Sequence, residues 1–200
     1  MQRERLSEEP NYKGVDEARL HRADIGERYW KADLYNPPVA EVPYGKKVTD
    51  YFAAMHELER HGCGMLLYGP HGSGKTSAAC RYLIEAMARA PVQARFVSAD
   101  DIDWLSTNRR EETREGARMW DLVVRDAQFL VIDDLGAEDD AEWKSPAVAH
   151  VLSQRYNRKL STVITTNLKP EALYKRCPRL GQLSVEVYEE IEVSGVRWRG

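Results

Sequence analysis

The sequence predicts an α/β fold, with a mostly parallel central sheet and helices on both of its faces. Short β-type runs alternate with helical runs along the chain, as they do in βαβ units. The runs LLY, FLVI and VIT contain no alternating polar residue, which is typical of strands that are buried on both faces. The 200 residues, of which 42% are hydrophobic, suffice for one sizeable core, so we expect one folded domain.

The elements are expected in the following order. Residues 1–22 are charged and lack apolar periodicity, which indicates either a short, frayed helix or a tail on the surface. The prolines of 37–45 predict an irregular connection, and a helix from Lys47 to Arg60 follows it. Strand MLLYG, a helix from Lys75 to Ala88, strand ARFVSA and a long polar helical region come next. FLVIDD, another helix and STVITTN complete the sheet, and the alternating run YEEIEV predicts an edge strand.

Charge, cysteine content and hydropathy exclude several classes of protein. A formal net charge of -3 provides no global basic field, so any contact with nucleic acid has to come from a local patch. Cys63, Cys80 and Cys177 form no CxxC pair and have no histidine at metal-ligand spacing, which predicts three packing residues in a reduced, cytoplasmic protein. No apolar run approaches the ~20 residues of a membrane span, and we expect no membrane partner.

The stretch GPHGSGKTS matches the phosphate-binding pattern G-x-x-x-x-G-K-[ST], and it lies between a predicted strand and a predicted helix, as the pattern requires. Backbone N–H groups of such a turn point inward and, with the positive end of the helix, form an anion cradle. Lys75 would reach the β- and γ-phosphates, and the Thr76 hydroxyl would hold Mg²⁺. We therefore predict a site for ATP and magnesium. Its residues are Gly69, Pro70, His71, Gly72, Ser73, Gly74, Lys75, Thr76 and Ser77.

Two further strands end on polar side chains. FLVIDD ends on Asp133 and Asp134, and STVITTN ends on Asn167. Because the carboxyl ends of parallel strands open into one crevice, we expect these side chains to face the phosphate loop. Asp133 would orient the magnesium shell, Asp134 would activate or position the attacking water, and Asn167 would hold the water or the γ-phosphate. The structural alternative is that all three are turn residues, which are common after strands.

The motifs GPHGSGKTS, FLVIDDLG and STVITTNL, in this order and spacing, resemble the AAA+ domain of DnaC-like helicase loaders and IstB-like transposase helper ATPases. ADIGERYWKADL and VSGVRWRG are similar to the family's opening and closing segments, so the resemblance covers residues 23–200. It implies a P-loop NTPase of the AAA+ type, a three-layer αβα sandwich without a helical lid. The loaders usually carry an N-terminal domain that grips the helicase; here either residues 1–22 make that contact as a short docking segment or another chain supplies it. Ile25 and Tyr29 would border the adenine by resemblance, and core packing is the alternative for both.

The resemblance also reveals a departure. Where the family has a form like P-R-I-x-S-R-L, this chain has PRLGQLS, so Leu183 replaces the arginine that commonly completes a neighbour's site. Such an arginine finger contributes about 10³ to 10⁵ in turnover, and its loss predicts slow hydrolysis with nucleotide binding retained. Arg179 and Arg176 are the candidates for a substitute finger, and a plain surface charge is the alternative for each.

The region of residues 100–128 lies where the loaders hold single-stranded DNA, according to the resemblance. Three of its arginines recur every four residues and would share one face of a helix, from which they would follow a phosphate backbone. The set consists of Arg109 and, in the repeat, Arg110, Arg114 and Arg118. Interleaved glutamates favour the alternative, a solvated face of salt bridges. Trp104 and Trp120 are expected in the core or in an interface.

The candidates are two closely related functions and two functions of other classes. The first is an ATP-dependent DNA-replication accessory protein that forms a homo-oligomer with ATP and places a replicative DNA helicase on single-stranded DNA. The second is an IstB-like helper that delivers a transposase. A small-molecule kinase would need an arginine-rich lid and an acceptor pocket, and the sequence indicates neither. A nucleotide-binding adaptor that does not hydrolyse ATP remains an alternative because of Leu183.

Overall fold

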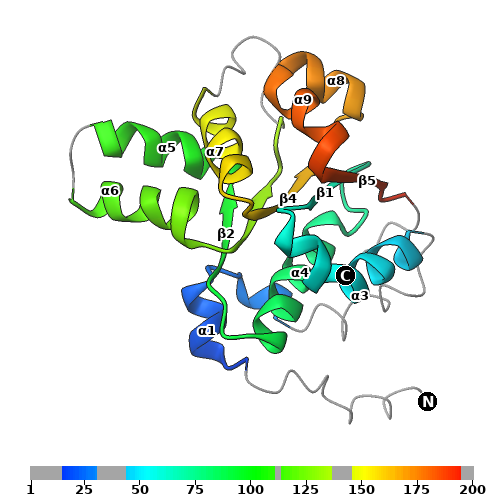
Figure 1. Ribbon diagram of the computed structural model, residues 1–200, viewed down its shortest axis with the longest axis horizontal. Helices are drawn as coiled ribbons and strands as arrows, with labels where there is room; N and C mark the ends of the chain where they lie inside the picture. Colours follow the sequence, from blue (N-terminus) through cyan, green and yellow to red (C-terminus); the bar gives the residue numbers. More distant parts are fainter. Residues whose placement is uncertain (1–14, 31–43, 111–113, 137–145, 195–200) are drawn as a thin grey trace.

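The computed structural model describes residues 15–30, 44–110, 114–136 and 146–194. Its centre is a five-stranded sheet with the order β2-β3-β4-β1-β5, in which every neighbouring pair is parallel (Figure 1). The strands are β1 (Gly64–Tyr68), β2 (Ala94–Ser98), β3 (Phe129–Asp133), β4 (Ser161–Thr166) and β5 (Tyr188–Glu192). The sheet is thus fully parallel rather than mostly parallel, and the expected positions of β4 beside β1 and of β5 at the edge are confirmed.

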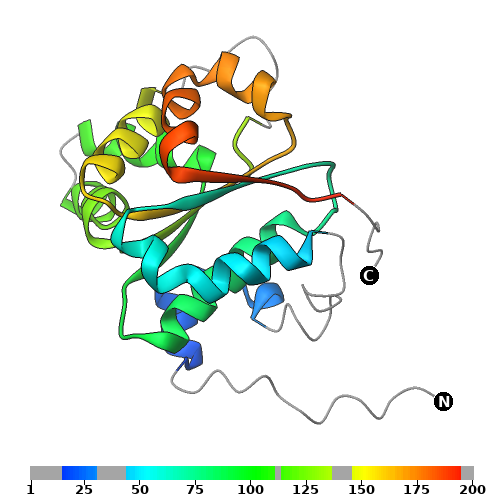
Figure 2. The same cartoon turned by 45° about the vertical axis from the view of Figure 1, so that its right-hand side comes forward.

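Helices cover both faces of the sheet, so the predicted three-layer αβα sandwich is confirmed (Figures 1 and 2). The first group packs on one face and comprises α1 (Glu17–Arg22), the 3-10 helix η1 (Glu27–Tyr29), α3 (Gly45–Arg60) and α4 (Lys75–Arg89). The second group packs on the other face and comprises α5 (Ala99–Arg110), α6 (Arg114–Asp121), the π-helix η3 (Leu122–Asp126), α7 (Pro146–Asn157), α8 (Pro170–Arg176) and α9 (Pro178–Val187).

The continuous apolar runs of the sequence follow from this two-sided cover. In β1, the side chains of Met65 and Leu67 enter the core cluster beneath α3 and α4, whereas Leu66 enters the cluster beneath α7 and α9. Successive side chains of a strand point to opposite faces, so every position of a strand that is covered on both faces is buried and favours an apolar residue. The same division places Val131 in the first cluster and Ile132 in the second.

The long polar helical region is two helices, and this corrects the expectation that its arginines share one helix face. Arg110 ends α5 and Arg114 begins α6, and the two helices lie side by side (Figure 1). Ile102 and Leu105 of α5 and Trp120 of α6 all enter one core cluster. One straight helix of this length would carry these side chains too far apart along its axis to enter one cluster together.

The described part of the N-terminal segment contains a short helix. The Asp16 side chain accepts a hydrogen bond from the Arg19 backbone N–H and caps α1. Leu20 is buried in the core, and the Ala23 carbonyl accepts a hydrogen bond from Phe96 N at 2.7 Å, which fixes the segment beside β2. Residues 1–14 and most of the proline-rich connection 37–45 lie outside the described residues.

A fully buried arginine joins the second helical layer to the sheet. Arg155 of α7 donates through Nε to Thr162 Oγ1 (2.8 Å), through Nη1 to the carbonyls of Val123 (2.9 Å) and Ala127 (2.8 Å), and through Nη2 to that of Ser161 (2.7 Å). Burial lowers the pKa of this guanidinium to about 10. The side chain therefore ties α7 to η3 and to the start of β4.

The cysteines agree with a further expectation from composition. All three cysteines are free, and two of them, Cys80 and Cys177, are buried in the core, as expected for packing residues. Burial raises the pKa of both thiols. None of the helices that the structure describes is long and apolar enough to cross a membrane.

Candidate nucleotide-binding site

A cavity of about 350 Å³ lies where the phosphate loop meets the carboxyl ends of β3 and β4. Because β3, β4 and β1 are consecutive neighbours in the sheet, residues from three distant parts of the sequence meet there. The lining residues are Arg28, Tyr29, His71, Gly72, Gly74, Lys75, Thr76, Ser77, Asp133, Asp134, Thr165 and Asn167. The structure thus brings together the loop and the polar strand ends that the sequence singled out.

The backbone of the loop is shaped by glycines in left-handed conformations. Gly72 has φ 76° and Gly74 has φ 97°, values that L side chains rarely adopt, and α4 begins directly after them at Lys75. The Ser73 hydroxyl is buried and has no hydrogen-bond partner among the described residues. Tyr44, which the sequence analysis missed, supports the loop from below, since its hydroxyl donates to the Ser73 carbonyl at 3.4 Å. The glycine turns, the N-terminus of α4 and the Ser73 hydroxyl without a partner together make the loop suitable for an anionic ligand.

Gly69 at the start of the loop is required for another reason. A Cβ atom at this position would lie 2.3 Å from the Val193 carbonyl oxygen, closer than any side chain tolerates. Val193 follows β5 and donates its N–H to the Tyr68 carbonyl at 2.7 Å. Gly69 therefore lets the end of β5 pass directly beside the loop.

The Lys75 ammonium group uses all three of its protons within the protein. Nζ donates to the carbonyls of Gly69 and Pro70, each at 2.9 Å, and to Asn167 Oδ1 at 2.8 Å. Burial lowers the pKa of Lys75, and the charges of Asp134 and Asp133 act in the opposite direction. A nucleotide phosphate would replace these neutral acceptors with charged oxygens.

A hydroxyl and a carboxylate form the candidate magnesium position. Thr76 Oγ1 donates to Asp133 Oδ1 at 3.0 Å, and Thr165 Oγ1 donates to the same oxygen at 2.6 Å. Burial raises the pKa of Asp133, while the hydrogen bonds from Thr165 and Thr76 lower it. No group of three histidine, cysteine, aspartate or glutamate side chains that could hold a metal occurs in the described parts of the chain. One hydroxyl and one carboxylate fit Mg²⁺, which completes its shell with phosphate oxygens and waters.

Asn167 connects the lysine to the second aspartate. Its Oδ1 accepts from Lys75, and its Nδ2 donates to Asp134 Oδ1 at 2.9 Å. Asp134 has φ 57°, a left-handed conformation that aspartate tolerates, and its N–H donates to Thr165 Oγ1 at 2.9 Å. Asp134 and Asn167 are both exposed, so water has access to the carboxylate.

The N-terminal segment contributes to the cavity in a way that the sequence only partly predicted. Tyr29 lines the cavity, but Ile25 is buried in the core and does not. Burial raises the pKa of Tyr29, whereas the neighbouring Arg28 charge lowers it. Arg28 was missed; its guanidinium lies 5.3 Å from the centre of the Tyr29 ring. One charged residue in a short polar stretch has no periodicity that would have identified it.

Comparison with known proteins assigns this chain to a family. Residues 46–174, well over half of the chain and including the phosphate loop, β3 and β4, match the family described as "IstB-like ATP binding protein". The chain belongs to the IstB-like ATP-binding family. No match exists among curated proteins.

Solved structures show the fold of this IstB-like protein. It is similar to the crystal structure of the DnaC helicase loader, with a TM-score of 0.65 and 23% identity over 84% of this chain and 100% of the other. The crystal structure of DnaI matches with a TM-score of 0.59 and 19% identity, over 76% of this chain and 83% of the DnaI chain. The structure of AMPPCP-bound DnaA from Aquifex aeolicus matches with a TM-score of 0.58 and 19% identity, over 82% of this chain and 53% of the DnaA chain. The fold is the AAA+ form of the P-loop fold.

The finger candidates of the IstB-like chain do not line its own cavity. Arg179 donates through Nε to Ser153 Oγ at 2.9 Å, and its guanidinium lies 5.8 Å from the centre of the Tyr156 ring. Arg176 donates to the Gly136 carbonyl at 3.5 Å. Leu183 is buried in the core beneath α9, so the position of the family's second arginine faces the interior here.

The candidate DNA-contacting residues belong to two helices, α5 and α6. In α6 of the IstB-like chain, Arg114 and Arg118 are exposed, and Arg118 also lines a second cavity. The side chains of Arg109 and Arg110 lie outside the described part of α5. Trp120 is buried and stacks on His150, whereas Trp104 is 61% exposed and therefore does not belong to the core.

Proposed function

We propose that this IstB-like protein is a magnesium-dependent ATPase that serves DNA replication by loading or remodelling a replicative helicase on single-stranded DNA. The observation that carries the proposal is the chain of contacts from Lys75 through Asn167 to the exposed Asp134. It joins a phosphate-binding cation to a carboxylate that water reaches, which suits water as the phosphoryl acceptor. The similarity in fold to the DnaC helicase loader, over all of the chain in that crystal structure, supports the replication role.

In the proposed reaction, each residue has a separate task. The loop N–H groups and Lys75 bind the phosphates, and Asn167 turns from Lys75 to the γ-phosphate or the attacking water. Asp134 orients this water and accepts its proton. Thr76 and Asp133 would hold Mg²⁺, which neutralises charge on the phosphates when it is bound. ATP would also promote association of several copies, and Arg179 or Arg176 would then reach the site of a neighbour.

The family supports a second candidate function, delivery of a transposase. IstB-like proteins share the ATP site, and nothing in the geometry of that site distinguishes the two client proteins. Binding of purified replicative helicase and of transposase from the same host to the ATP-loaded protein separates these functions. Association with the helicase alone supports the loader, and association with the transposase alone replaces it.

ATP turnover with and without single-stranded DNA tests the proposal. We expect slow release of phosphate by the protein alone and a rate increase of at least tenfold with DNA, because DNA would bring subunits and their arginines together. Transfer of phosphate to a metabolite would instead identify a kinase. Tight binding of ATP without turnover under either condition would support the adaptor, which the buried Leu183 favours.

A further inference from the structure

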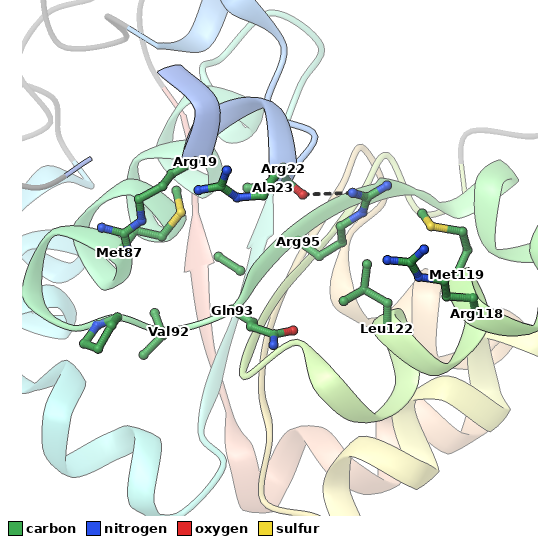
Figure 3. A pocket seen from close by; sticks show the side chains of 12 residues that line it. Arg19, Arg22, Ala23, Met87, Val92, Gln93, Arg95, Arg118, Met119 and Leu122 are labelled. Carbon is green, nitrogen blue, oxygen red and sulfur yellow. Dashed lines mark hydrogen bonds between the residues drawn. The ribbon is translucent and has the colours of Figure 1, made fainter. Parts of the chain in front are cut away.

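A second and larger groove, of about 630 Å³, lies at the end of the sheet where β2 begins. Its walls come from α1, from the end of α4, from the start of β2 and from α6 with η3 (Figure 3). Four arginines from three of these elements surround the opening, and none of the residues that line the groove is acidic. They are Arg19, Arg22, Arg95 and Arg118, and we call this feature the arginine groove.

Much of this positive charge is not neutralised by neighbouring carboxylates. Arg95 pairs with Asp24 at 3.0 Å and donates to the Arg22 carbonyl at 3.0 Å, but its Nε is buried without a partner among the described residues. Arg19 donates to the carbonyl oxygen of Ala90 at 3.2 Å. Arg22 and Arg118 are exposed, and neither forms an ion pair with any carboxylate that the structure describes. Among the residues that the structure describes, Arg22 and Arg118 thus face the groove without a carboxylate partner, and Arg95 shares a single one, Asp24.

The inner surface of the groove is apolar. Met87 from the end of α4 and Val92 form one side, and Met119 of α6 and Leu122 of η3 form the other (Figure 3). Methionine side chains adapt their shape and are common at surfaces that accept varied apolar partners. No aromatic ring lines the groove, whereas sites for single-stranded nucleic acid usually stack bases on such rings.

We propose that the arginine groove binds an acidic segment of a partner protein. Carboxylates of the segment would pair with the arginines in bidentate, charge-assisted hydrogen bonds, and its apolar side chains would cover the partly exposed Val92, Met119 and Leu122. A groove of this volume accommodates only a few residues of such a segment. The proposal goes beyond the ATPase function, since the groove needs neither ATP nor hydrolysis to form.

The experiment uses the full chain and a fluorescein-labelled peptide of alternating glutamate and leucine, with binding measured by fluorescence anisotropy. We expect binding to the wild type and a loss of affinity of about tenfold or more in the double variant Arg22→Glu, Arg118→Glu. These two side chains are exposed, so the variant is expected to fold, which circular dichroism checks. The matched control, Arg158→Glu with Lys175→Glu, makes the same change in charge at exposed positions outside the groove.

Two altered peptides and one nucleic acid make the result specific. Replacing glutamate by glutamine or leucine by serine in the peptide should each weaken binding, because the proposal requires both the charge and the apolar side chains. An absence of peptide binding, or an equal loss of affinity in the control variant, would overturn the proposal. Oligothymidylate that competes with the peptide and loses affinity in the same groove variant would assign the arginines to DNA instead. The assay contains no ATP, so a failure of the ATPase proposal leaves its outcome unchanged.

Discussion

In the nucleotide site, Lys75 donates its three ammonium protons to Gly69, Pro70 and Asn167. These acceptors keep the lysine in place beneath the loop. Asn167 also donates a hydrogen bond to Asp134. If Lys75 released Asn167 to bind a phosphate, the hydrogen bonding of the exposed Asp134 carboxylate would therefore change as well. In the proposed ATPase, the amide of Asn167 would therefore connect phosphate binding to the geometry for hydrolysis.

The first prediction concerns Lys75→Ala. We expect the affinity for ATP to fall by about a hundredfold or more, since charge-assisted hydrogen bonds to two phosphates contribute about 1.5–3 kcal/mol each. Isothermal titration with ATP and magnesium measures the change. Lys47→Ala is the control, because Lys47 is an exposed lysine of α3 that does not line the cavity. Unchanged affinity in Lys75→Ala would refute the assignment of the phosphate loop.

The second prediction concerns Asp134→Asn. Asparagine tolerates the left-handed backbone at φ 57° and still accepts from Asn167, so the fold and ATP binding should be kept. Turnover should fall by about 10² or more, because the amide cannot accept the proton of the water. Single-turnover phosphate release measures this loss, with Asp126→Asn, an exposed aspartate of η3, as the control. A fully active variant would move the water-activating role to another residue.

At the scale of elements, α9 explains why this chain departs from the family pattern at Leu183. The helix packs on the sheet with Leu180 and Leu183 in the core, whereas Val185 on its outer side is 89% exposed. A side chain that is to reach a neighbouring subunit has to start from the outer side. Leu183 is thus a packing residue, and an arginine at this position would point into the core instead of toward a neighbouring subunit.

The third prediction follows from that placement. Leu183→Arg should destabilise the protein by about 3 kcal/mol or more, because it buries a charge without a partner in an apolar cluster. Val185→Arg, in the same helix, should change the free energy of unfolding by no more than about 0.5 kcal/mol. Urea denaturation of the two variants makes the comparison. A stable Leu183→Arg variant with increased turnover would show that the position reaches an ATP site after all.

The positions of the helices and strands show which features the sequence can predict and which it cannot. Apolar runs located β1, β3 and β4, and the glycine pattern located the loop, because strand burial and phosphate binding depend on nearby residues. The division between α5 and α6 escaped prediction, since the polar helical pattern continues across it and only the packing of Ile102 and Trp120 into one cluster reveals two helices. Arg28 and Tyr44 escaped for a similar reason: their roles come from contacts across the fold.

At the scale of the whole molecule, an ATPase of this kind would work as an assembly of several copies. Arg176 and Arg179 are partly exposed near the surface of α8 and α9 and do not line the cavity of their own chain. In the proposed homo-oligomer, one of these arginines serves the next subunit. The active unit would then be a pair of neighbouring chains, since one chain supplies Asp134 and the other supplies the cation.

The fourth prediction tests this arrangement by mixing two inactive proteins. Asp134→Asn keeps its arginines, and Arg179→Ala keeps its water-activating aspartate, so some neighbouring pairs in a mixture would contain one intact site. We expect the phosphate release of the mixture to exceed the sum of the separate rates severalfold. A mixture of Asp134→Asn with Arg176→Ala tests the other arginine in parallel. Strictly additive rates in both mixtures would exclude a shared site.

Helix α4 begins at Lys75 in the nucleotide site and reaches the arginine groove at Met87, roughly 18 Å further along its axis. The segment of α1 and η1 also borders both places, through Arg22 at the groove and Tyr29 at the cavity. A ligand at one place that shifts this helix or this segment would change the affinity at the other place, and linkage would make that coupling reciprocal. Any factor by which ATP changes the affinity for an acidic segment is then the factor by which that segment changes the affinity for ATP.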